Sequence, residues 1–170
     1  MTGNCSCFRD TDRYRGFMWR LLTGWLVLGS LSTALAGDAV TGRVVKVLPF
    51  FLDLKGQAAL SPSLYDRDAY QAYLRRYTHQ RSALRFDVLW KTSDAGEAKL
   101  KLKLELRGIG QDGMPRQATL EQTVTPHYFR HWDSLVLGGE DYKNFGELVA
   151  WRVTLWTDHQ LLGEQKSFLW

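Results

Sequence analysis

The residues best suited to chemistry lie in one short stretch, 125–133. His127 and His131 are four positions apart, so on a helical turn their imidazoles would share a face, with Asp133 close by. Two histidines and a carboxylate can hold zinc and leave one position open for water. The stretch lacks an H-E-x-x-H sequence, which would supply a base. We therefore favour a polar, aromatic loop between strands and keep the metal site as an alternative.

The same stretch carries aromatic side chains that suit a binding surface. Tyr128, Phe129 and Trp132 lie within it, and Trp156 lies on a later predicted strand, on the face opposite Trp151. Large, rigid rings dominate many contacts with ligands and protein partners. The sequence predicts that these four residues bind a partner, with packing beneath a helix as the alternative.

Other motifs have simpler explanations. Residues 108–113 fit G-x-G-x-x-G, but Pro115 and a strand follow where a dinucleotide site needs a helix, so we expect a hairpin loop. No G-x-S-x-G sequence is present, and no catalytic residue or cofactor is predicted. The acidic pairs 66/68 and 140/141 stand at predicted helix starts, where negative charge is favourable.

A basic stripe runs along one predicted strand. It consists of Lys99, Lys101, Lys103 and Arg107. We favour a solvated face that discourages aggregation between sheets. The alternative is contact with an anionic polymer of the cell surface.

The elements that must position these residues are mostly strands. Leu84, Phe86, Val88 and Trp90 alternate with polar residues, and after a turn at 93–96 four leucines at 100–106 alternate with charged residues. Successive side chains of a strand point to opposite faces, so both segments are predicted strands with one buried face. Further strands are expected at 43–54, 117–124, 134–137, 149–156 and 161–170, the first at a sheet edge or broken because it contains Pro49.

One helix is expected at about 66–78, lying across the sandwich or at one end. Ser63 can cap it, Asp66 completes a capping-box pattern, and Tyr70, Tyr73, Leu74 and Tyr77 form an apolar stripe at helical spacing. A single helical turn is expected at 140–145. The sequence thus predicts a mainly β domain of about seven strands with one added helix.

The end of the chain resembles that of a known architecture. The run 137–142, the strand 149–153, a tight turn and a last strand resemble the end of an immunoglobulin-like or fibronectin-type sandwich. The mature chain also resembles uncharacterised secreted bacterial proteins of this type. The resemblance implies a sandwich but no activity, because such folds host many functions.

The first residues predict export. Four arginines precede an uncharged run at 21–36 that ends in Ala34-Leu35-Ala36. This pattern is typical of a signal peptide cleaved after Ala36, and the run is short for an uncleaved membrane anchor. Met18 is an alternative start, in which case residues 1–17 are not made. The predicted mature domain, 37–170, contains neither cysteine of the chain.

Charge and compartment set the partners. The chain carries a net charge of +4, and residues 1–36 contain four arginines and two aspartates, which leaves about +2 on the mature domain. This balance gives no electrostatic case for nucleic acid. We expect a periplasmic or secreted, non-catalytic module that binds a protein or a cell-envelope polysaccharide, and membrane contact only through an uncleaved signal segment. The alternatives are a metal protein or hydrolase using residues 127, 131 and 133, and a small outer-membrane barrel.

Overall fold

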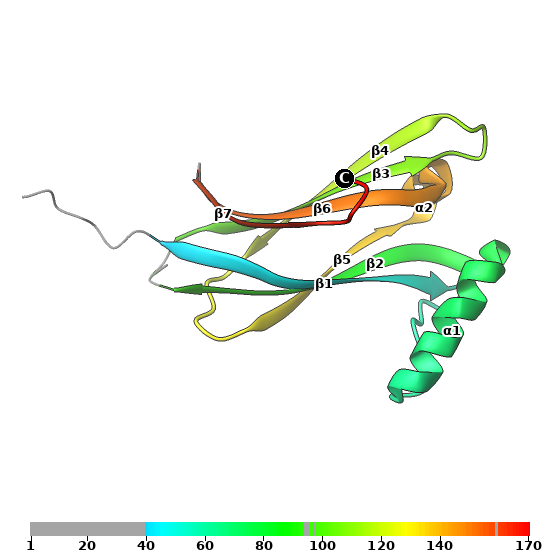
Figure 1. Ribbon diagram of the computed structural model, residues 1–170, viewed down its shortest axis with the longest axis horizontal. Helices are drawn as coiled ribbons and strands as arrows, with labels where there is room; N and C mark the ends of the chain where they lie inside the picture. The colour runs from blue at the N-terminus through cyan, green and yellow to red at the C-terminus, as the bar shows by residue number, and fades with distance from the viewer. Residues whose placement is uncertain (1–39, 94–95, 97, 159) are drawn as a thin grey trace, which may run out of the picture. The chain divides into compact units, whose positions relative to one another are not determined.

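Two antiparallel sheets form the described part of the chain. The computed structural model describes residues 40–170, except 94–95, 97 and 159. Strands β1 (Thr41–Asp53), β2 (Arg81–Ser93) and β5 (His131–Gly138) form one sheet in the order β1-β2-β5. Strands β3 (Leu100–Ile109), β4 (Pro115–Val124), β6 (Glu147–Thr157) and β7 (Gln160–Lys166) form the other in the order β4-β3-β6-β7. Figure 1 shows the sheets as two layers. The predicted mainly β, seven-stranded architecture is confirmed, whereas the immunoglobulin-like connectivity remains a prediction.

The predicted signal segment 1–36, its cleavage after Ala36 and the alternative start at Met18 lie outside the described residues. The described residues belong to one compact unit. Across the part of the chain that is described, no helix combines the length and apolar character that a membrane span requires.

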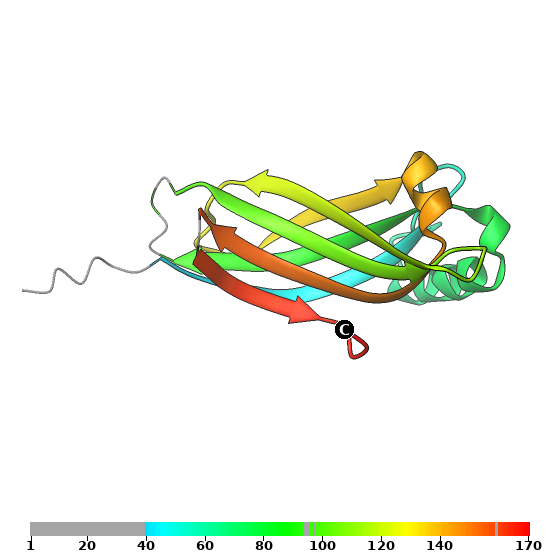
Figure 2. The ribbon, with the colours of Figure 1, turned by 90° about the horizontal axis from the view of Figure 1, so that it is seen from above.

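The core lies between the inner faces of the two sheets. The alternating residues of β2 and β3 supply half of the buried residues of the main core cluster, each at most 1% exposed: Leu84, Phe86, Val88, Trp90, Leu100, Leu102, Leu104 and Leu106. Their charged neighbours take the outer faces, as the period of a strand requires. Strand β1 of the three-stranded sheet lies beside β7 of the four-stranded sheet, as Figure 2 shows. A Cβ atom on Gly163 of β7 would lie 3.0 Å from the Arg43 Cα atom, so glycine permits this close approach.

Strand β1 is an edge strand, which resolves the expectation about Pro49. Pro49 lies opposite Phe86 of β2, and the other side of β1 pairs with no strand in its sheet. Proline has no N–H to donate, and an edge strand needs donors on one side only. The strand continues through Pro49, and its register shifts lie elsewhere, at Val44/Lys46 and Leu52/Asp53.

Helix α1 (Leu64–Arg76) lies at one end of the three-stranded sheet (Figure 1). Ser63 caps it by accepting a hydrogen bond from the Asp66 N–H at 3.4 Å, but the Asp66 carboxylate accepts from Ser61 rather than completing the capping box. The predicted apolar stripe is wrong for Tyr73 and Tyr77, which are exposed, whereas Leu74 is buried as predicted and Tyr70 is half-buried. Gln71 is buried instead, since its amide bonds to the Phe51 N–H and C=O, each at 2.9 Å.

Arg81, the first residue of β2, fastens the end of α1 to the sandwich. Its guanidinium donates to the carbonyl oxygens of Leu74 and Arg75, each at 2.5 Å, and to the Glu147 carboxylate at 2.7 Å. It also stacks over the Phe51 ring, 3.9 Å from the centroid. The carbonyls at a helix end have no partner within the helix, so these bonds satisfy a buried terminus.

Asp53 fastens the other side of α1. Its carboxylate accepts from the Tyr70 hydroxyl at 2.7 Å and from the N–H groups of Lys55 and Gln57 at 2.8 Å. Burial raises the pKa of the Asp53 carboxyl, but these hydrogen bonds outweigh burial and hold the pKa below its usual value. The hydrogen bond to Asp53 and burial raise the pKa of Tyr70 to about 12.

Candidate functional site

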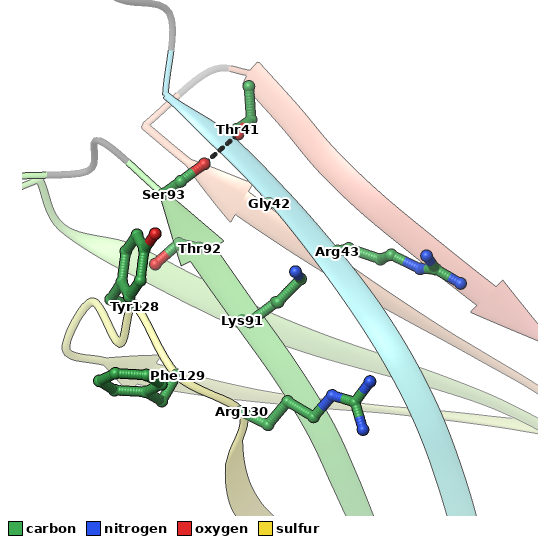
Figure 3. A pocket seen from close by; sticks show the side chains of 9 residues that line it. All are labelled: Thr41, Gly42, Arg43, Lys91, Thr92, Ser93, Tyr128, Phe129 and Arg130. Atoms are coloured by element: carbon green, nitrogen blue, oxygen red, sulfur yellow. Dashed lines mark hydrogen bonds between the residues drawn. The ribbon is translucent and has the colours of Figure 1, made fainter.

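A cleft opens at the end of the three-stranded sheet remote from α1. Its volume is about 640 Å³, within the usual range for ligand sites. Three segments line it: the start of β1, the end of β2 and the loop between β4 and β5 (Figure 3). The lining residues are Thr41, Gly42, Arg43, Lys91, Thr92, Ser93, Tyr128, Phe129 and Arg130.

Two predicted aromatic residues form one wall of this cleft. Tyr128 is 73% exposed and Phe129 is 80% exposed, and their rings meet edge to face with centroids 5.4 Å apart. The loop that carries them is fixed to β2, because the Thr92 N–H and hydroxyl both bond to the His127 carbonyl oxygen, at 2.9 and 3.3 Å. These bonds hold the loop backbone next to Tyr128 in place, which lowers the conformational entropy that ordering the wall on binding would cost.

The predicted histidine pair lies behind the wall and packs on the core. The His127 and His131 rings stack with centroids 3.9 Å apart, and both meet the buried Trp90 ring edge to face. Asp133 accepts a hydrogen bond from the Trp90 indole N–H at 2.7 Å and one from Gln122 at 3.3 Å. These contacts give each of the three side chains a packing role beneath the aromatic loop.

The three residues proposed for a metal do come together, but not in the expected way. The stretch is not helical: His127 lies in a loop and His131 begins β5. His131 Nε2 and Asp133 Oδ2 are 3.9 Å apart. Stacked imidazoles direct their lone pairs in two nearly parallel planes rather than toward one point. Among the residues that the structure describes, no group of three or more histidine, cysteine and acidic residues is placed to hold a metal ion.

A row of cations lies along the cleft on the outer face of the sheet. Arg43 of β1 is directly opposite Lys91 of β2. Trp90 is opposite His131, so Arg130, one residue earlier, continues the row beside Lys91. Within the described part of the chain, no lining residue is acidic, and none of the three cations forms an ion pair with another described residue.

The other two predicted binding residues lie elsewhere. Trp132 is 46% exposed on β5, where it pairs with Leu89 on the same outer face as the cation row. Trp156 lies on the four-stranded sheet, in a separate hollow lined by the basic stripe. The structure therefore divides the predicted aromatic set between two surfaces.

Two of the four cations of the predicted basic stripe are paired with carboxylates in the described part of the chain. Lys101 pairs with Glu121 at 2.9 Å, and Lys103 pairs with Glu105 at 3.3 Å. Arg107 stacks on the ring of Trp170, 4.0 Å from the centroid. These contacts favour the interpretation as a solvated face over an anion site. The glycine motif likewise forms the β3–β4 hairpin loop, closed by the Gly110 N–H and the Met114 carbonyl oxygen at 2.9 Å.

Sequence reasoning missed the three cations of the cleft. They come from three separate segments and become neighbours only through the register of β1, β2 and β5. Arg130 alone had a signal, since it lies inside the aromatic stretch.

Searches against family models, curated proteins and solved structures return no match to this chain.

Proposed function

We propose that the chain is an exported, non-catalytic β-sandwich domain that binds a polysaccharide of the cell envelope or its surroundings through the cleft. The observation that carries the proposal is the wall formed by Tyr128 and Phe129, two exposed rings held in edge-to-face contact beside an open cavity. Aromatic faces pack well against the apolar C–H faces of sugar rings. A fixed wall loses little entropy on binding, so its contact area contributes to affinity.

The neighbouring polar residues support a binding role over a catalytic one. Asp133 is held by Trp90 and Gln122, and the imidazoles of His127 and His131 are stacked on each other. Groups committed to packing in this way position the loop. The rings of Tyr128 and Phe129 then act as the contact surface.

The test compares two pairs of aromatic substitutions in the full chain. Tyr128→Ala with Phe129→Ala removes the wall, and Tyr65→Ala with Phe168→Ala removes equally exposed rings of the same types elsewhere. On a glycan array and in pull-downs with polysaccharide resins, the wall variant is expected to lose about tenfold or more in affinity, because a buried aromatic anchor contributes roughly 1–2 kcal/mol. Glycan binding that survives the wall variant, or silence of the unsubstituted protein on both, contradicts the proposal.

Export is tested separately by the mass of the protein recovered outside the cytoplasm. The proposal predicts a chain that begins at Gly37. A chain that keeps its first residues and stays in the cytoplasm contradicts it.

A further inference from the structure

We propose that the ligand of the cleft is an acidic polysaccharide, whose sugar rings carry carboxylate or sulfate groups. The inference rests on the proposed function and adds the chemistry of the ligand. It comes from the cation row of Arg43, Lys91 and Arg130, which the aromatic wall alone does not explain.

Like charges lie side by side along the cation row. Arg43 and Lys91 are directly opposed on neighbouring strands, where like charges repel, and Arg130 extends the row. Elsewhere the outer faces bring opposite charges together, as in Lys101 with Glu121 and Arg152 with Glu105. A row of cations that the described residues leave uncompensated is relieved by an anion bound across it.

The charged side chains that line the cleft are hydrogen-bond donors. Arg and Lys side chains are donors without acceptor capacity. Three of the four hydroxyls among the described lining residues already have a partner, since Thr41 bonds to Ser93 and Thr92 donates to the His127 carbonyl oxygen. The described residues that line the cleft include no Asp, Glu, Asn or Gln. A neutral sugar hydroxyl can accept from these donors only as an uncharged group, whereas carboxylate and sulfate oxygens form the stronger charge-assisted hydrogen bonds, so the lining favours an anionic ligand.

The placement of the aromatic rings beside the cations favours a glycan over an acidic peptide. Figure 3 shows Tyr128 and Phe129 together on one side of the cleft, with Lys91, Arg130 and Arg43 across from them. Ring and charge thus lie side by side on one surface. A uronic acid or sulfated sugar offers a flat C–H face and an anionic group on the same ring, and a polymer repeats both along the row.

The experiment uses probe pairs that differ only in charge. Polygalacturonate is compared with its fully methyl-esterified form, and dextran sulfate with dextran, by affinity electrophoresis of the full chain at 50 and 300 mM NaCl. We expect each acidic probe to bind at least tenfold tighter than its neutral partner. We also expect its affinity to fall at least tenfold at the higher salt, because exposed charges are then screened.

The variants are matched in composition. Arg43→Gln, Lys91→Gln and Arg130→Gln together remove the row, and the control removes one lysine and two arginines that are exposed elsewhere, Lys55, Arg75 and Arg76. The row variant is expected to lose the preference for acidic probes, and the control variant to keep it. Circular dichroism establishes that both variants fold.

Three outcomes overturn the inference. Equal binding of the acidic and neutral forms, lost on replacing Tyr128 and Phe129, refutes the charge argument and leaves the proposed function standing. Equal loss in the row and control variants shows a nonspecific effect of net charge. Tighter binding of poly-glutamate than of either acidic polysaccharide, dependent on the cation row, assigns the cleft to an acidic protein partner instead.

Discussion

Replacing Lys91 with Gln is expected to make the free protein more stable while it weakens ligand binding. Lys91 lies in the middle of the cation row, opposite Arg43 and beside Arg130. Two unit charges about 7 Å apart in water repel by roughly 0.6 kcal/mol, and a like-charged cross-strand pair costs about 0.2–1 kcal/mol. Lys91 has two such neighbours, and splayed side chains lower each repulsion, so we expect the substitution to raise the free energy of unfolding by about 0.5–1 kcal/mol.

The assay is thermal unfolding of the full chain in low salt, followed by circular dichroism. A gain of this size raises Tm by about 2–4 °C for a domain of this length. Lys101→Gln is the control, because Lys101 is also on an exposed strand face but pairs with Glu121 at 2.9 Å, so its loss should lower Tm slightly. In 0.5 M NaCl the two effects should shrink together, since the Debye length is then about 4 Å. A Lys91→Gln protein that is no more stable than the Lys101→Gln protein at low salt refutes the reasoning.

The remaining predictions concern the scaffold and the metal alternative. Arg81→Met is expected to lower the free energy of unfolding by about 2–4 kcal/mol in urea titrations, because it leaves the end of α1 unpaired, and an unchanged midpoint would contradict this. Gly146→Ala should cost more than about 2 kcal/mol, since φ is +78° and the new Cβ atom would lie 2.2 Å from the Ile109 carbonyl oxygen; thermal unfolding within 1 °C of the parent would rule it out. The pKa of Asp53 is lowered by folding, so its contribution to stability is present above its unfolded pKa and is lost as the pH falls through its folded pKa. The pKa of Tyr70 is raised by folding, so its contribution is complete below pH 10 and is lost as the pH approaches about 12. In Asp53→Asn both pH dependences should flatten, as read from unfolding midpoints across pH. Removal of metal with a chelator should leave Tm unchanged, and a drop would revive the histidine site.

The sheets were accessible from the sequence because their pattern is simple. In β2 and β3 every second residue is apolar, and these residues became the core. The predicted strand 134–137 is shorter than β5, because His131, Trp132 and Asp133 were interpreted as site residues rather than as part of a strand. The structure shows why they belong to it: Trp132 faces outward opposite Leu89, and Asp133 faces inward and bonds to Trp90.

Sequence patterns do not predict which face of helix α1 is buried or which residues meet at the cleft. Helical spacing groups Tyr70, Tyr73 and Tyr77 on one face but does not say that this face is buried. The inner face instead carries Gln71, because the backbone at Phe51 needed partners for its N–H and C=O groups. The cation row depends on strand register across the sheet, and one sequence does not determine that register.

The most direct test of the central claim, that the cleft is the binding site for an acidic glycan, is an NMR titration of the ¹⁵N-labelled protein with a galacturonate oligosaccharide. The account predicts shift changes concentrated in the amides of residues 41–43, 91–93 and 128–130. Changes centred instead on Lys101 and Trp156 of the opposite sheet, or none at saturating ligand, would contradict it.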